Sequence, residues 1–100
     1  MEYRFIGWCQ DEKTNADKVW AVIKLNGDHW GGAYATVWGR RGKKLQHKVI
    51  DHSNTWDIDS LIRSKTRKDY ARIDESQLNE VYPDFQNDLE ATAFWAMLKA

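Results

Sequence analysis

Residues 34–44 (YATVWGRRGKK) constrain the fold of this chain more than any other segment. They begin as a strand, because Tyr34, Thr36 and Trp38 recur at every second position and so face one side of a sheet. The strand then meets two glycines that bracket two arginines at residues 39–42. Glycine adopts the positive φ of a tight turn at no steric cost. We therefore expect a β-strand that ends in a cationic turn at one end of a sheet.

A large aromatic side chain beside fixed positive charge is a suitable surface for a nucleotide. Trp38 offers an apolar face on which a sugar or a base can stack, while nearby cations hold phosphate. The cations that follow it are Arg40, Arg41, Lys43 and Lys44. The same residues also fit a different arrangement, in which Trp38 packs in the core and the arginines form a solvated turn. The sequence leaves both arrangements open.

Two motifs of the chain resemble those of the WGR domain family. Residues 38–40 spell Trp-Gly-Arg, the tripeptide for which the family is named. Residues 65–70 (KTRKDY) are similar to a downstream Lys-Thr segment of the family that ends in an aromatic residue. The resemblance extends over residues 3–73. It predicts a WGR-like domain over 1–73, followed by an acidic helical extension over 74–100 that packs on the same domain.

The resemblance also implies a function. WGR domains accompany the catalytic regions of DNA-dependent poly(ADP-ribose) polymerases, where they bind DNA at breaks or ends, and they occur in small bacterial proteins. By this likeness Trp38 would stack on the sugar of a terminal nucleotide, and Arg40 would contact phosphate or a neighbouring domain. Lys65 and Tyr70 align with family positions near the nucleic acid. The chain departs from the family at Asp69, where a glycine is common.

Positive charge is concentrated in the middle of the sequence, although the formal net charge is zero. Residues 35–72 hold ten Lys or Arg against four Asp or Glu, a charge of +6. Residues 73–100 hold one Lys against six Asp or Glu, a charge of −5. A basic block is typical of a surface that binds a polyanion, and also of ordinary solvated faces. The residues predicted to bind nucleic acid are Trp38, Gly39, Arg40, Arg41, Lys43, Lys44, Lys65, Arg67, Lys68 and Tyr70.

Alternating and β-branched segments predict four strands before the first helix. These strands cover residues 3–9, 19–25, 30–38 and 44–50. Between the second and third strands, Asn26-Gly27 predicts a hairpin with dihedrals that suit a type I′ turn. Gly31-Gly32 predicts a bulge or a close backbone approach in the third strand. We therefore expect an antiparallel meander sheet that is covered on one face.

Three helices and a short returning strand are expected after these strands. The strand covers residues 71–73, and the helices cover 54–64, 75–82 and the segment from 87 onward. Ser53 or Asn54 can cap the first helix, and Asp74 the second. Asn87 with Glu90 matches a capping box for the third. The predicted fold class is α+β: a four-stranded or five-stranded antiparallel meander sheet with one helix packed on it and two C-terminal helices.

Few residues in this chain support catalysis or metal binding. A single Cys9 excludes an internal disulfide and a four-cysteine zinc site. The three histidines match no standard zinc spacing. The sequence contains no glycine-rich phosphate loop and no apolar run long enough to span a bilayer. We therefore expect a cytoplasmic protein that is not an enzyme and that has no cofactor, no metal and no membrane contact.

Two functions from different classes remain. The first is sequence-independent binding of nucleic acid, preferably DNA ends or single strands, with phosphate contacts supplying most of the affinity. The second is a protein-protein interaction module, or regulator, that uses the WGR-like fold without binding nucleic acid. In that case the acidic helices after Asp74 would face the partner, or would shield the basic residues until a polyanion displaces them.

Overall fold

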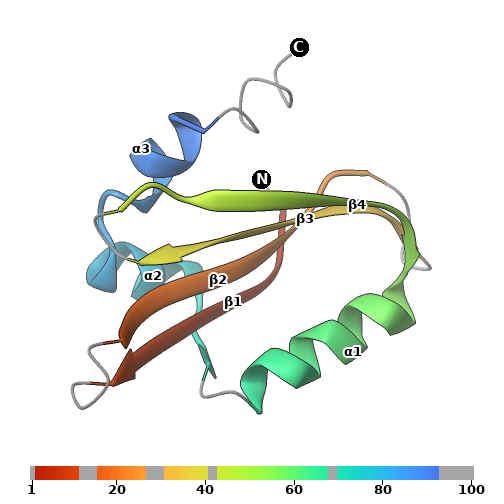
Figure 1. Cartoon of the computed structure of the whole chain (residues 1–100), viewed down its shortest axis with the longest axis horizontal. Coiled ribbons are helices and arrows are strands. Elements are labelled where there is room, and N and C mark those ends of the chain that lie inside the picture. Colours follow the sequence, from red (N-terminus) through yellow and green to blue (C-terminus); the bar gives the residue numbers. More distant parts are fainter. Residues whose placement is uncertain (1, 12–15, 27–30, 41–42, 68–69, 93–100) are drawn as a thin grey trace.

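The computed structural model describes residues 2–11, 16–26, 31–40, 43–67 and 70–92. It contains five strands and three helices within these ranges. In chain order they are β1 (Glu2–Asp11), β2 (Ala16–Lys24), β3 (Gly31–Arg40), β4 (Gln46–Asn54), α1 (Thr55–Thr66), β5 (Ala71–Arg72), α2 (Glu75–Val81) and α3 (Phe85–Glu90) (Figure 1).

The strands form one antiparallel sheet in the order β4-β3-β2-β1-β5. The first four strands are a meander, and β5 returns to the free edge of β1, where Arg72 pairs with Gly7 and Ala71 pairs with Trp8. The predicted α+β class is confirmed, and the sheet has the five strands of the larger predicted version.

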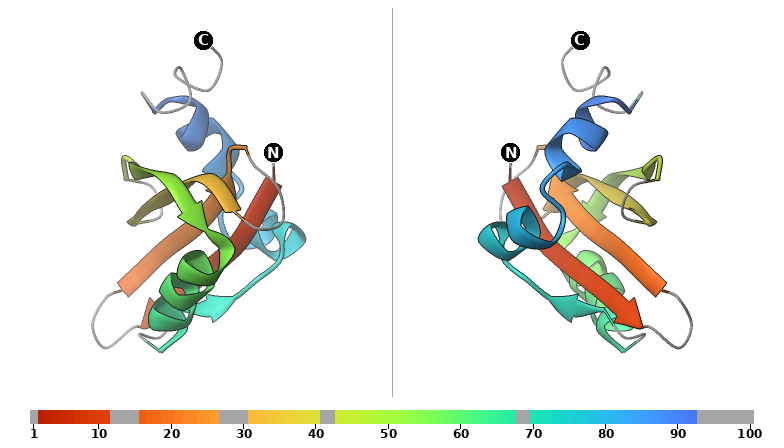
Figure 2. Two further views of the ribbon diagram at one scale, coloured as in Figure 1. Left: turned by 90° about the vertical axis from the view of Figure 1, so that its right-hand side faces the viewer. Right: turned by 90° about the vertical axis from the view of Figure 1, so that its left-hand side faces the viewer.

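Both faces of the sheet are covered, so the expectation of cover on a single face was wrong. The helix α1 lies across one face, whereas α2 and α3 pack against the other (Figure 1 and Figure 2). The reason lies in the two central strands, where residues 19–23 and 33–37 are all buried. Because both faces of these strands are apolar, a layer of helix is needed on each side.

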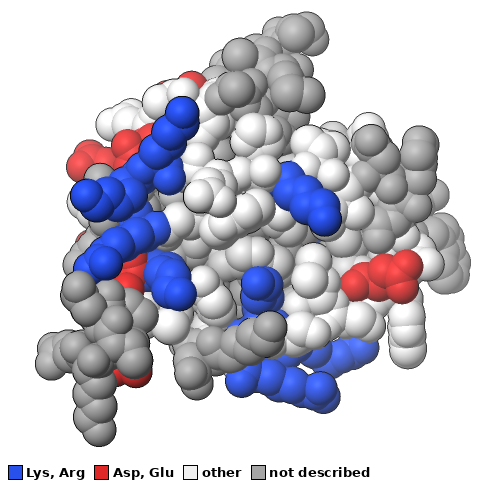
Figure 3. Space-filling view, viewed as in Figure 1, with Lys and Arg blue, Asp and Glu red and all other residues white. Residues whose placement is uncertain are grey.

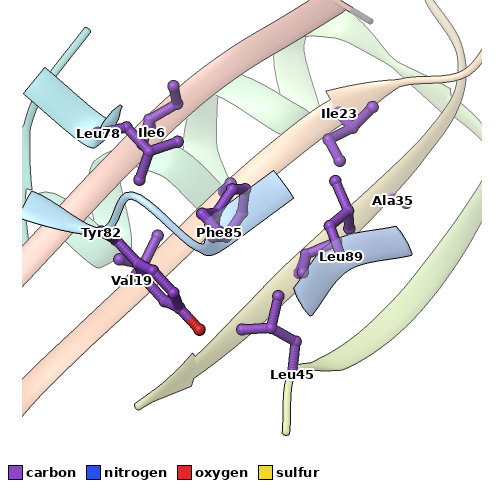
Figure 4. Close-up of a cluster of buried hydrophobic side chains, with 11 residues drawn as sticks. Ile6, Val19, Ile23, Ala35, Leu45, Leu78, Tyr82, Phe85 and Leu89 are labelled. Atoms are coloured by element: carbon purple, nitrogen blue, oxygen red, sulfur yellow. The ribbon is translucent and has the colours of Figure 1, made fainter. Parts of the chain in front are cut away.

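The pleat of the sheet sends different side chains to its two faces. The α1 face is packed with Phe5, Trp20, Val22, Tyr34, Ile58 and Ile62. The opposite face carries smaller strand residues, which are covered from the C-terminal segment by Leu78, Tyr82, Phe85 and Leu89 (Figure 4). The alternation predicted for β3 is confirmed, because Tyr34 and Trp38 pack on the α1 face while Ala35 and Val37 pack on the other.

Two bulges shift the register of the sheet. One lies between Gly32 and Tyr34, as the glycine pair predicted, and the φ of Gly32 is 155°. The other lies between Tyr3 and Phe5 and had no sequence signal. It turns Tyr3 toward Phe85 on the α3 side, with 6.5 Å between the ring centroids, while Phe5 packs on the α1 face. Regular alternation along the strand predicted over residues 3–9 would place both rings on one face, and the bulge places them on opposite faces.

The hairpin predicted between the second and third strands is confirmed, because β2 and β3 pair antiparallel. The amide of Leu25 donates to the carbonyl of Ala33 at 2.9 Å, so the chain reverses over the residues between them. Asn26 contributes through its side chain, whose Oδ1 accepts the N–H of Ala33 at 3.1 Å. The type I′ dihedrals predicted at Asn26-Gly27 involve Gly27, which lies outside the described residues.

The first two helices begin where their caps were predicted. The side chain of Asn54 accepts the N–H of Asp57 at 2.8 Å and so caps α1. At α2, Asp74 and Gln77 form a reciprocal capping box, with bonds of 2.8 and 3.0 Å. Because α1 follows β4 directly, the Asn54 cap lies at the junction of strand and helix.

The third helix begins earlier than predicted. Its first residue is Phe85, so Asn87 lies inside α3 and does not cap it. Burial explains the difference, because Phe85 and Leu89 are spaced one turn apart and both pack into the core. The remaining part of the predicted helix, residues 93–100, lies outside the described residues.

The substitution Leu89→Ala tests whether α3 packs into the core. The Leu89 side chain is fully buried, so we expect Leu89→Ala to lower the free energy of unfolding by about 2–5 kcal/mol. Urea denaturation measures this change. The adjacent exposed residue supplies the control, since Glu90→Ala should change the free energy by no more than about 0.5 kcal/mol. Equal unfolding midpoints for the two variants would contradict the packing of α3 on the sheet.

Candidate functional site

A pocket of about 230 Å³ opens on the α1 face of the sheet. It lies beside α1, and its walls come from β2, β3, β4, α1 and the residue before β5. The lining residues are Trp20, Thr36, Trp38, Lys48, Ile50, Leu61, Lys65 and Tyr70. The two sequence motifs therefore meet here, because Trp38 belongs to the first motif, and Lys65 and Tyr70 belong to the second.

The sheet register places two tryptophans next to each other in this pocket. Trp20 of β2 is the direct cross-strand partner of Trp38 of β3. Cross-strand partners share a face, so both indoles lie on the α1 side. Trp20 is buried in the core, whereas Trp38 is only half-buried. Neither predicted arrangement of Trp38 describes it fully, since this indole packs against the core and also lines the pocket.

Lys65 is placed by the last turns of α1. Its Nζ lies 5.5 Å from the centroid of the Trp20 ring, within the range of a cation-π contact. Leu61, one turn earlier on the helix, lines the same pocket. Lys48 contributes a second ammonium group from β4. The pocket thus combines aromatic walls with positive charge from two different elements.

Tyr70 reaches the pocket because Gly7 of β1 leaves space for it. A Cβ at Gly7 would lie 3.2 Å from the Cβ of Tyr70 and 2.7 Å from Cε1 of Phe5. The N–H of Tyr70 donates to the carbonyl of Lys65 at 3.4 Å, which ties the residue to the end of α1. Burial raises the pKa of the Tyr70 phenol above its ordinary value of 10.0, and the nearby Cys9 side chain adds to this effect. The phenol therefore stays protonated and can donate a hydrogen bond.

The cationic turn begins one residue later than expected. Gly39 belongs to β3 and does not have a positive φ, so that prediction was wrong. The glycine provides space instead, because a Cβ there would lie 3.0 Å from Cδ2 of Leu45. The N–H of Lys43 donates to the carbonyl of Arg40 at 3.0 Å and closes the turn, and Arg40 is exposed at the end of β3. Residues 41–42 lie outside the described ranges.

The predicted basic residues do not lie on one patch. Lys43 and Lys44 line a separate cleft on the α3 side of the sheet, together with Asp88. Arg67 is exposed at the C-cap of α1, and Lys68 lies outside the described residues. Figure 3 shows the Lys and Arg side chains of this view in several separate groups, with uncharged surface between them. Among the predicted residues that the structure describes, the pocket brings together only the side chains of Trp38, Tyr70 and Lys65.

Five lining residues had no sequence signal that assigned them to a site. They are Trp20, Thr36, Lys48, Ile50 and Leu61. Alternation could show that the strand residues share a face, but it could not show which strand positions lie opposite each other. The pairings of Trp20 with Trp38 and of Thr36 with Lys48 supply that information.

The described lining residues of the pocket include no carboxylate, and its aromatic rings and lysines offer ring stacking and anion binding. Within the part of the chain that the structure describes, no group of three His, Cys, Asp or Glu could hold a metal ion. No described helix is both long and apolar enough to cross a membrane. Comparisons with protein-family models, with curated proteins and with solved structures found no match to the chain.

The substitution Gly7→Ala tests the close packing of Gly7 against Phe5 and Tyr70. We expect Gly7→Ala to destabilise the fold by about 1–3 kcal/mol, because the new methyl group overlaps a buried ring. Urea denaturation gives the value. Replacing Phe5 by Leu in the same background should recover part of the loss, since the closest contact is with the edge of that ring. Strictly additive effects of the two substitutions would contradict the contact.

Proposed function

We propose that this protein binds nucleic acid without sequence preference and holds one nucleotide of a DNA end or single strand in the pocket beside Trp38. The observation that carries the proposal is the meeting of Trp38, Lys65 and Tyr70 in one pocket. Stacking on an indole accepts any base or sugar, and contacts between lysine and phosphate carry no sequence information. The protein then acts by binding and not as an enzyme.

The size of the pocket supports the binding of a single ring. Its volume of about 230 Å³ is below the roughly 300–1,000 Å³ that is typical of pockets for drug-sized ligands. One sugar or base can therefore enter while the rest of the strand stays on the surface. Lys48 and Lys65 line the pocket and supply positive charge for the attached phosphates.

The resemblance to the WGR family supports the same site. In that family the motif tryptophan stacks on the sugar of a terminal nucleotide, and Trp38 here lines a pocket. Arg40 stands two residues further along β3 and so shares the face of Trp38. Its guanidinium is therefore available to a phosphate beyond the pocket. The lone Cys9 supports a cytoplasmic location, where cysteines stay reduced.

Trp38→Ala tests the stacking contact. We expect the variant to bind labelled single-stranded, blunt or nicked DNA more weakly by about 1–3 kcal/mol, as measured by fluorescence anisotropy at low salt. Trp56→Ala is the matched control, because Trp56 lies on α1 outside the pocket and is 74% exposed. Thermal unfolding shows that each variant is folded. If the unmodified protein binds none of the three DNAs at low salt, the proposal fails.

Lys65→Gln tests the contact with phosphate. Removing one such contact from a single strand should make the slope of log K against log salt less negative by about 0.7. Lys43→Gln removes the same charge on the α3 side of the sheet and should leave the slope unchanged. Equal changes in the two variants would contradict a phosphate contact that is specific to the pocket.

A second candidate function is protein binding without nucleic acid, and Trp56 is the observation that favours it. This side chain is largely exposed on the first turn of α1, with the guanidinium carbon of Arg63 6.0 Å from its ring centroid. Tryptophan and arginine are enriched among the residues that dominate protein interfaces. In this case Trp56→Ala would abolish the binding of a partner protein, whereas Trp38→Ala would retain it. The unmodified protein would not bind DNA.

A further inference from the structure

A second concave site lies on the other flank of α1, and we call it the arginine groove. Its volume is about 340 Å³, and its lining residues are Arg4 of β1, Asp59, Ile62 and Arg63 of α1, and Arg72 of β5. The pocket beside Trp38 uses Leu61 and Lys65 of the same helix. Because α1 points Ile58 and Ile62 into the core, these two sets of residues lie on opposite flanks.

The arginine groove carries more positive than negative charge. Nη2 of Arg4 donates to Oδ1 of Asp59 at 2.8 Å, and these side chains are 41% and 38% exposed. Arg63 and Arg72 have no carboxylate partner among the described residues. Three guanidinium groups thus share one groove with a single carboxylate. Their mutual repulsion would be relieved by a bound anion.

Neighbouring side chains orient the two unpaired arginines without using up their donors. Nη2 of Arg63 donates to the hydroxyl of Ser60 at 3.1 Å, which leaves its other N–H groups free. The guanidinium of Arg72 lies over the ring of Phe5, with 4.9 Å between Cζ and the ring centroid. Stacking of this kind occupies the flat face of the guanidinium and leaves the N–H groups at its rim.

We propose that the arginine groove binds phosphate groups, and that these are backbone phosphates of the strand whose nucleotide enters the pocket. The second part of the proposal rests on the proposed function. One guanidinium group can bind two oxygens of a phosphate through two parallel N–H donors. Arg63 and Arg72 are suited to this contact. Each site takes one residue from the end of α1 and one from the segment around β5. A strand that passes over the end of this helix therefore contacts both sites.

Tripolyphosphate tests the groove apart from the stacking contact at Trp38, because it carries phosphate but has no base or sugar. We expect the full-length protein to bind it at low ionic strength in isothermal titration calorimetry. The double variant Arg63→Gln, Arg72→Gln should bind about tenfold more weakly, because charge-assisted bonds to phosphate are lost. The control Lys43→Gln, Lys44→Gln loses the same charge on the α3 side and should bind as the unmodified protein does.

Asp59 gives a test in the opposite direction. Asp59→Asn removes the only carboxylate that lines the groove among the described residues, so we expect tripolyphosphate to bind several-fold more tightly. Asp57→Asn makes the same charge change on the same helix, outside the groove, and should have a smaller effect. Equal effects of these two substitutions would overturn the site, since they would indicate a response to net charge alone.

The outcomes with DNA separate this proposal from the proposed function. With a single-stranded oligonucleotide, the double arginine variant should make the salt slope less negative by about 1.4, the sum for two lost contacts. If the unmodified protein fails to bind tripolyphosphate, or if the double variant binds both ligands unchanged, the groove is overturned and binding at Trp38 still stands. If arginine-dependent tripolyphosphate binding occurs without any oligonucleotide binding, the proposed function fails. The groove is then a site for another phosphate compound.

Discussion

The pairing of β2 with β3 determines most of what this molecule presents to its surroundings. Trp20 lies opposite Trp38 in this register, so both indoles face α1, whereas Ala21 and Val37 pair on the other face. A slip of β3 by one residue would turn its side chains to the opposite face. Tyr34 and Trp38 would then face α3, and α1 would lose part of the aromatic surface on which it packs. The pocket and the packing of the C-terminal helices therefore depend on the same set of strand contacts.

Features that depend on residues close in sequence were predictable. The alternation of β3 and the caps at Asn54 and Asp74 involve neighbours within a few positions, and the structure confirms them. The bulge between Tyr3 and Phe5 was not predictable, because it is set by pairing with β2. The early start of α3 has a similar cause. Burial against the sheet outweighs the local capping pattern at Asn87.

The residues of the candidate site also divide into those that a local motif indicates and those whose position depends on the folded sheet. Trp38 and Lys65 could be singled out because each belongs to a short motif that sequence alone displays. Trp20 was missed, since its place depends on strand register. Lys43 and Lys44 were expected beside Trp38, but the chain after the turn enters β4 through a buried leucine that packs on the α3 side. That burial carries the two lysines away from the pocket.

The direct passage from β4 into α1 has a mechanical consequence. β4 ends at Asn54 and α1 begins at Thr55, so no linker separates them, and the Asn54 side chain accepts a hydrogen bond from the N–H of Asp57. β4 and α1 are therefore joined directly at one bend, and each of them supplies a wall of the pocket. A ligand wider than the pocket would have to separate β4, the edge strand, from β3. The width of the pocket opening is therefore limited by the backbone hydrogen bonds between these two strands.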